Sequence, residues 1–135
     1  MTVADLPENV RHSAARHLLD GVGNTVAAQR LGYGRPGWTV ADALGGPPEA
    51  RPLTGTRGLS APAAAFATGV MLHSLDFDDT HAGALVHATA VSLPAAFAVG
   101  QQVSASGADV LTAAALGLET ACRLGDVSPH GFHAR

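Results

Sequence analysis

The chain has 135 residues, of which 47% are hydrophobic and 14% charged, and its net charge at pH 7 is −3. This composition excludes an intrinsically disordered chain, and the basic residues, which are all arginines, form no stripe of the kind that binds nucleic acid. The N-terminus lacks a signal-peptide pattern, no apolar run reaches membrane-spanning length, and Cys122 is the single cysteine, so we expect a cytoplasmic protein that contacts neither nucleic acid nor membrane.

The first predicted element is a helix, or two short helices, over residues 6–32. Pro7 and Glu8 suit a first helical turn. Gly21 and Gly23 lie inside the pattern and predict either a break or a close contact with another helix. Apolar residues recur at helical spacing at Val10, Ala14, Leu18 and Val22.

Residues 32–58 are rich in glycine and proline around one short helix, roughly residues 39–44. This composition predicts an extended but ordered connection within one domain. Gly32, Gly34 and Gly37 match the spacing of a dinucleotide-binding motif, but that motif needs a preceding strand. Here a helix precedes and Pro36 interrupts, so loop glycines are the better interpretation.

Three further helices follow. Residues 60–73 form an apolar run with Pro62 in its first turn, and residues 88–103 are helical in composition, with Pro94 predicting a nearby start or a kink. Ser106 and Asp109 have the spacing of a capping box, which predicts a helix to residue 124 with Gly125 just past its end. No β-alternation of useful length is present, so we predict an all-α fold whose alanine-rich core lets helices approach closely.

The stretch "HSLDFDDTHAGALVH", residues 73–87, holds three aspartates and three histidines in a chain with few charges. The simplest interpretation is a solvated acidic loop that caps the next helix. A second is a Mg²⁺ site, since hard cations prefer clustered carboxylates. The Asp-x-Asp-Asp spelling also resembles the acid motif of protonating terpene cyclases, although the chain has few of the aromatics that those enzymes use. A third is general acid–base chemistry without metal, in which a carboxylate orients His81 or His87.

The segment "HSLDFDDTHAGALVHATAVSLPAAFAVGQ" closely resembles the signature of the MmgE/PrpD family, which includes 2-methylcitrate dehydratases, cis-aconitate decarboxylases and iminodisuccinate epimerases. The resemblance extends to "LPENVRHSAARHLLDGVGNTVAA" and "SGADVLTAAALGLETACRLGDV", and so covers nearly the whole chain. It implies that residues 1–135 are part of a mostly helical N-terminal domain, which a smaller α/β domain follows in the family.

The resemblance also implies a function and site residues. The family's reactions move protons on small di- and tricarboxylates without a metal or organic cofactor, and its full-length members are expected to form homo-oligomers, as dimers. Asp76 and His87 match the family's catalytic positions, and Thr80 matches a substrate-binding position. A further family histidine lies in an Arg-Gly-Phe-His segment. Either "GFHAR" is that segment and His133 binds substrate, or the match lies beyond Arg135.

Two departures qualify what the chain does alone. The family usually has Asn-Gly where this chain has Thr68-Gly69, and its active sites use lysines from later in the chain, whereas this sequence has none. We therefore expect an N-terminal portion of a lyase or isomerase, without measurable turnover by itself. The alternative is a catalytically inactive remnant or a helical interaction domain. For the geometry, we expect one helical turn to place Asp76 and Thr80 on a concave surface with His87, while Asp78 and Asp79 point elsewhere.

Overall fold

The computed structural model describes residues 1–127, and this part of the chain forms helices without any sheet strand. A short 3₁₀ turn, Val3–Asp5, precedes five α-helices. The all-α prediction is therefore confirmed for the described residues. None of these helices is long and apolar enough to cross a membrane. The bounds are α1 Glu8–Arg30, α2 Arg35–Leu44, α3 Ala61–His73, α4 Ala88–Gln102 and α5 Gly107–Asp126.

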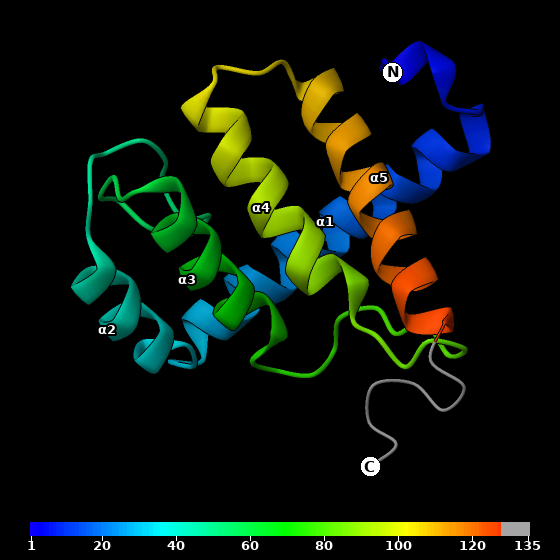
Figure 1. Cartoon of the computed structure of the whole chain (residues 1–135). Helices are drawn as coiled ribbons and strands as arrows, with labels where there is room; N and C mark the ends of the chain where they lie inside the picture. The colour runs from blue at the N-terminus through cyan, green and yellow to red at the C-terminus, as the bar shows by residue number, and fades with distance from the viewer. Residues whose placement is uncertain (128–135) are drawn as a thin grey trace.

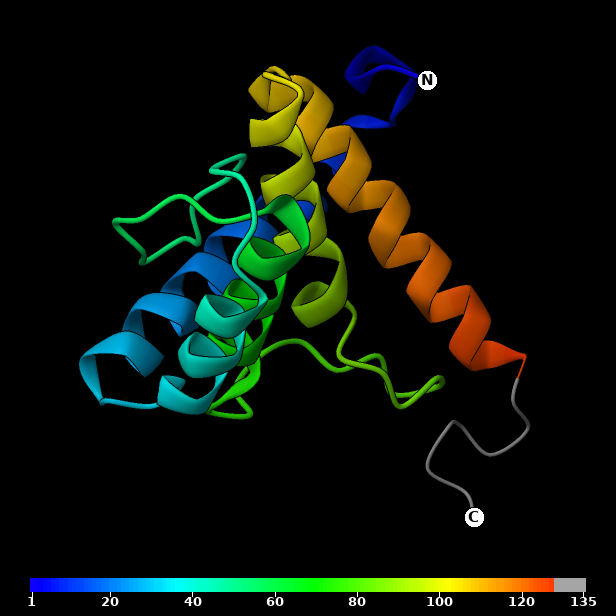
Figure 2. The same cartoon turned by 60° about the vertical axis from the view of Figure 1, so that its left-hand side comes forward.

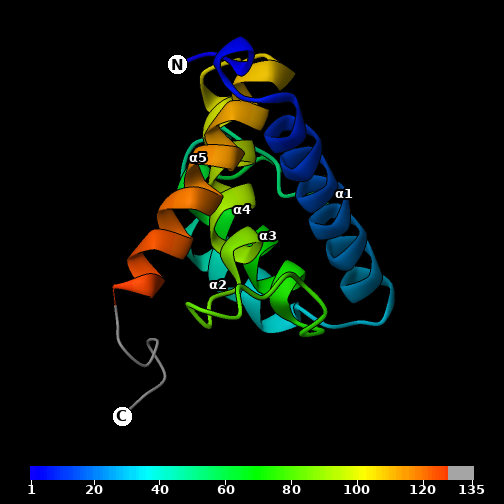
Figure 3. The ribbon, with the colours of Figure 1, turned by 90° about the vertical axis from the view of Figure 1, so that its right-hand side faces the viewer.

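Helices α3, α4 and α5 run alternately down, up and down in the view of Figure 1, and each packs against the next. Helix α1 contacts all three, and α2 packs against α3. Figure 3 shows α1 and α5 on either side of the α3–α4 pair. Residues 74–87, called the acidic loop below, join the lower ends of α3 and α4, opposite the N-terminus (Figures 1 and 2).

Small residues let the helices approach closely, as the composition predicted. The buried hydrophobic residues are mostly alanines, and Leu59, Met71, Leu72 and Leu93 are the large ones among them. Helix α1 continues unbroken through Gly21, where a Cβ would lie 2.9 Å from Leu93 Cδ1 and 3.0 Å from Leu72 Cδ1. Gly21 therefore marks a close contact between helices, which was one of the two predicted outcomes.

The glycine- and proline-rich segment between α2 and α3 is ordered by hydrogen bonds at several points. Ala50 and Leu59 form an isolated antiparallel bridge. The side chain of Gln101 on α4 accepts from Arg51 N and donates to Arg51 O, both at 3.0 Å. Thr68 Oγ1 on α3 accepts from Leu53 N at 3.2 Å. Residues 32–58 are thus the ordered connection that the sequence predicted. The short helix expected within them is α2, which begins earlier than predicted, at Arg35.

Helix α4 tolerates Pro94 in its interior. Because proline has no amide hydrogen, the carbonyl of Ala90 loses its helical donor. Helix α3 comes very close at this point, since a Cβ on Gly69 would lie 3.1 Å from the Ala90 oxygen. Pro94 does not start the helix, because α4 begins six residues earlier, just after His87.

Helix α5 starts as the capping box predicted. Ser106 Oγ accepts from Asp109 N at 3.2 Å, and the Asp109 carboxylate accepts from Ser106 N at 3.2 Å. The predicted end is wrong, because the helix continues to Asp126 and Gly125 lies inside it. Gly125 is needed for packing instead, since a Cβ there would lie 2.3 Å from Ala84 Cβ in the acidic loop.

We expect Ser106→Ala to raise the pKa of Asp109 and to destabilise α5. The hydrogen bond from the Ser106 side chain, and to a smaller extent the one from its backbone, hold the Asp109 pKa below its ordinary value of 3.8. A carboxyl with a lowered pKa in the folded state stabilises the protein above its unfolded pKa, and this stabilisation disappears as pH falls through the folded value. NMR titration of the Asp109 carboxyl carbon measures the shift.

Urea unfolding checks the same prediction thermodynamically. The stability difference between the wild type and Ser106→Ala should be larger at neutral pH than in acid, where Asp109 is protonated in both proteins. An Asp109 pKa that is identical in the two proteins would contradict it.

Candidate functional site

The acidic loop begins where α3 ends at His73, and its backbone does not continue as a helix. Asp76 has a φ of 55°, in the left-handed region that aspartate tolerates better than most residues. The predicted helical turn from Asp76 to Thr80 is therefore wrong. The left-handed residue turns the chain away from the helix axis, and the residues after it fold back beneath α3 and α4.

Asp78 lies at the centre of the site, with a fully buried side chain. Its Oδ1 is 3.0 Å from His73 Nδ1, and its Oδ2 is 3.5 Å from His87 Nδ1. The prediction that Asp78 points elsewhere is wrong. It assumed that carboxylates would repel one another in a single pocket, but a hydrogen bond with His73 and the nearby ring of His87 make a buried carboxylate tolerable.

His87 is the last residue of the acidic loop, immediately before α4, and its ring faces Asp76 and Asp78. Its Nε2 lies 3.6 Å from Asp76 Oδ1, so the structure brings these two predicted site residues together. The rings of His73 and His87 meet edge to face, with centroids 4.6 Å apart and an interplanar angle of 62°. His87 Nδ1 is buried and has no hydrogen-bond partner within residues 1–127. Each nitrogen of His87 thus has a carboxylate oxygen within 3.6 Å.

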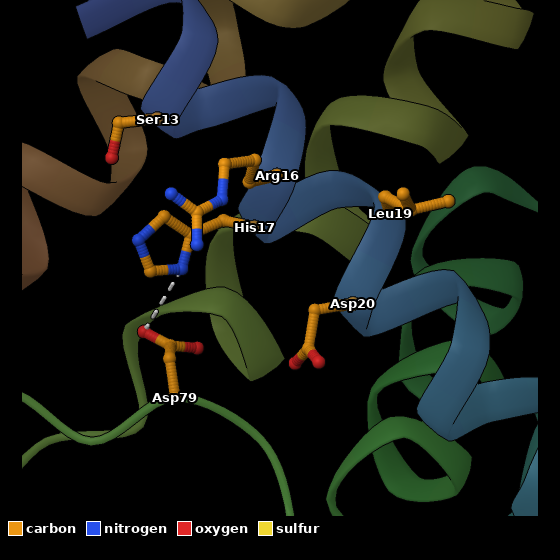
Figure 4. Close-up of a pocket in the computed structure, with 6 residues that line it drawn as sticks. All are labelled: Ser13, Arg16, His17, Leu19, Asp20 and Asp79. Carbon is orange, nitrogen blue, oxygen red and sulfur yellow. Dashed lines mark ion pairs between the residues drawn. The ribbon is translucent and has the colours of Figure 1, made fainter.

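Asp79 points away from this cluster, as predicted. Its Oδ1 accepts from Thr89 N at 3.0 Å, in the first turn of α4, and its Oδ2 lies 3.8 Å from His17 Nδ1 on α1. Figure 4 shows the His17 ring facing Asp79, with Arg16 beside it. All three residues line a cavity of about 540 Å³. Asp79 therefore ties the acidic loop to α1 and to the start of α4.

Two of the other histidine and threonine candidates, Thr80 and His81, are not brought to the cluster by any contact in the described structure. Thr80 is exposed, and its hydroxyl forms no hydrogen bond within the described range. His133 lies outside the described residues. His81, the second imidazole considered, accepts from Ala84 N at 3.0 Å and lies 3.8 Å from Asp126, so it stabilises the far end of the loop.

An open groove of about 790 Å³ lies beside the two imidazoles, between α3 and α4. His73 and His87 lie on its wall, and no arginine within residues 1–127 does so. The rest of the lining is mostly apolar. Among the lining residues are Phe66, Val70, Leu85, Val91 and Pro94.

The same cluster is also the set of described side chains that could hold a metal ion. One ligand atom from each of His73, Asp76, Asp78 and His87 lies within 4.8 Å of the others. A mixed set of imidazoles and carboxylates suits a transition metal such as Zn²⁺ better than Mg²⁺. The three-aspartate Mg²⁺ site considered from the sequence does not form, because Asp79 points to α1 and α4.

His73 and Asp78 are the two members of the cluster that the sequence did not predict as site residues. Their spacing of five residues across a helix end was the available signal. It indicates a contact only once the chain is known to turn back at Asp76. No pattern in the sequence reveals that turn.

Known protein families give an independent comparison for the whole chain. The sequence model of the MmgE/PrpD N-terminal domain matches residues 1–134. The chain belongs to the MmgE/PrpD family. The resemblance seen in the acidic loop and its flanking helices is thus confirmed over nearly the whole chain, and the helices of the structure agree with a helical N-terminal domain.

Among curated relatives, the chain is 27% identical over 144 residues to a cis-aconitate decarboxylase-like protein, oryM, of Aspergillus oryzae. That match covers 97% of this chain and 30% of the relative. It is 26% identical over 140 residues to a cis-aconitate decarboxylase of Aspergillus terreus, covering 96% of this chain and 29% of that enzyme. The chain therefore spans less than a third of the length of these relatives. No solved structure matches it.

Proposed function

We propose that this MmgE/PrpD chain supplies the helical part of a lyase or isomerase that acts on small di- or tricarboxylates. Proton transfer by general acid–base groups would carry the reaction, without a metal or organic cofactor. The observation that supports this most is the pair formed by Asp76 and His87, 3.6 Å apart at the edge of a groove about 790 Å³ in volume. A groove of this size has room for a compact polycarboxylate.

Imidazole suits this role because it gains and loses a proton near neutral pH. In this proposal His87 exchanges a proton with the substrate, and Asp76 stabilises the positive charge that forms on the ring. General acid–base groups of this kind contribute about 10²–10⁴-fold to rate. Thr80, and His133 if it is the family histidine, would donate hydrogen bonds to substrate carboxylates.

The negative charge of a polycarboxylate substrate requires cations at the site. Asp76 and Asp78 are acidic, and no arginine in residues 1–127 lines the groove. A polyanionic substrate therefore needs cations besides those in this groove. The MmgE/PrpD resemblance points to lysines, which this chain lacks. Turnover by the 135 residues alone is accordingly not expected.

The relatives' names favour decarboxylation of a tricarboxylate as the first reaction to test. In that reaction the bond between carbon and a carboxylate breaks, carbon dioxide leaves, and the electron pair that remains takes up a proton. A dehydratase would instead remove a proton beside a carboxylate and expel hydroxide as water. Both reactions need a proton-transfer group where the proposal places His87.

A turnover assay tests the proposal. Protein expressed from its complete reading frame, and treated with a chelator, is given cis-aconitate or 2-methylcitrate, and release of carbon dioxide and loss of water are followed. We expect turnover of one compact polycarboxylate without added metal. No turnover across a panel of such acids, or activity that depends on a metal, would contradict the proposal.

A second candidate function is a helical interaction domain without catalysis, and one surface favours it. Helices α4 and α5 expose an apolar face around a groove of about 540 Å³. Residues on this face are among the large hydrophobic side chains that remain exposed: Val91, Val99, Leu116 and Leu124. Contiguous apolar surface of this kind favours association.

We expect the chain to self-associate through this face, and Val99→Glu to reduce the association by placing a charge in it. Light scattering at several protein concentrations measures the average mass. Leu19→Glu, on the exposed side of α1, is the matched control and should leave the mass unchanged. A monomer at all concentrations would contradict self-association. Equal loss in both variants would contradict this choice of face.

A further inference from the structure

Asp78 joins two imidazoles through one buried carboxylate. Its side chain is fully buried, while His73 and His87 each keep part of the ring exposed. Asp78 Oδ1 and Oδ2 lie 3.0 and 3.2 Å from His73 Nδ1, and Oδ2 lies 3.5 Å from His87 Nδ1. Both histidines therefore direct the same ring nitrogen, Nδ1, to the same carboxylate.

The tautomer of a histidine is set by the hydrogen bond that one of its nitrogens makes. An ionised carboxylate accepts hydrogen bonds and donates none. A neutral imidazole that faces such a carboxylate through Nδ1 carries its proton there and leaves Nε2 as the unprotonated atom. His87 makes no such hydrogen bond within the described residues, since its Nδ1 lies 3.5 Å from Asp78 Oδ2 and its Nε2 lies 3.6 Å from Asp76 Oδ1. Nδ1 and the Asp78 carboxylate are both buried, whereas Asp76 is exposed and screened by water, so the proton is favoured on Nδ1.

We propose that Asp78 is a positioning residue that fixes both His73 and His87 as the Nδ1–H tautomer, and that Nε2 of each ring is the atom left to exchange protons. His73 then becomes a second oriented imidazole on the groove wall, beside His87. The catalytic meaning of this arrangement rests on the proposed function, but the tautomers themselves do not.

The competing explanation of the cluster is a metal site, because the same four side chains offer ligand atoms within 4.8 Å. A metal would take the lone pair of the nitrogen that binds it, which then could not carry a proton. The two explanations therefore predict different protonation at Nδ1 when the metal binds through Nδ1, and a chelator distinguishes them when the metal binds through Nε2. The proposal requires a proton on Nδ1 of both rings, whereas a metal bound through Nδ1 excludes one.

Long-range ¹H–¹⁵N spectra of the histidine-labelled 135-residue chain, at a pH where the rings are neutral, report the tautomers directly. His73→Gln and His87→Gln assign the two ring signals. We expect Nδ1 of both rings to be protonated and Nε2 to be unprotonated, with no change when a chelator is added. The measurement needs neither substrate nor turnover, so it can fail while the proposed function stands, and the reverse.

Asp78→Asn is the decisive variant, because its amide has nearly the same shape but can donate to Nδ1. At least one of the two rings should then switch to the Nε2–H tautomer. Asp79→Asn is the matched control, since the neighbouring carboxylate contacts Thr89 and His17 instead. It should leave both ring tautomers unchanged, and circular dichroism checks that both variants keep their helices.

Three results would overturn the proposal. The first is an Nε2–H tautomer for either ring in the wild type, which stands even if Asp78→Asn fails to fold. The second is an unchanged tautomer pair in a folded Asp78→Asn variant. The third is a change in the His73 and His87 signals on chelation, which would identify the cluster as a metal site.

Discussion

His87→Gln is expected to lower kcat by about 10²–10⁴-fold in protein expressed from its complete reading frame. Glutamine keeps much of the side chain's length and polarity, but it cannot take up or release a proton near neutral pH. His87 is the residue that the structure places against Asp76, at 3.6 Å, and on the wall of the groove. The loss should therefore fall mainly on kcat, with a smaller change in KM.

His12→Gln is the matched control for this prediction. His12 lies on an exposed part of α1 beside Glu8, far along the chain from the acidic loop, and its replacement should leave kcat unchanged. Unfolding curves of both variants show whether the fold is kept. Wild-type kcat in a folded His87→Gln variant would remove His87 from the mechanism, whatever the MmgE/PrpD resemblance implies.

Leu93→Ala is expected to lower the free energy of unfolding by about 2–5 kcal/mol. Leu93 on α4 is fully buried, and its Cδ1 packs against the backbone of α1 at Gly21. Because most of the buried residues are alanines, few large side chains are available to fill the space left by the deletion. A loss of this size is a large share of the stability of an ordinary domain.

Urea denaturation followed by circular dichroism measures this loss. Val103→Ala, at the end of α4, is the matched control, because Val103 is 63% exposed and its truncation should change stability by less than about 0.5 kcal/mol. Equal effects at the two positions would show that α4 does not pack on α1 through Leu93 in solution.

The helices themselves were predictable because their signals are local. The spacing of apolar residues, Pro62 in a first turn and the Ser106–Asp109 capping box each act within one or two turns of chain, and the structure confirms the elements that they predict. The alanine-rich composition also indicated close helix packing, which Gly21 shows. Where two local signals compete, the outcome depended on contacts with distant parts of the chain, which are α3 at Pro94 and the acidic loop at Gly125.

For the site, the sequence by itself determined that acidic groups and imidazoles gather in residues 73–87, and its MmgE/PrpD resemblance indicated Asp76 and His87 as the pair to examine. Only the tertiary structure decided which carboxylate lies between the imidazoles. Asp78 was expected to avoid the pocket, because an argument from like charges counts repulsion and not the donors that offset it. The two imidazoles that offset the repulsion, His73 and His87, come from the ends of two helices, and the left-handed turn at Asp76 brings one carboxylate between them.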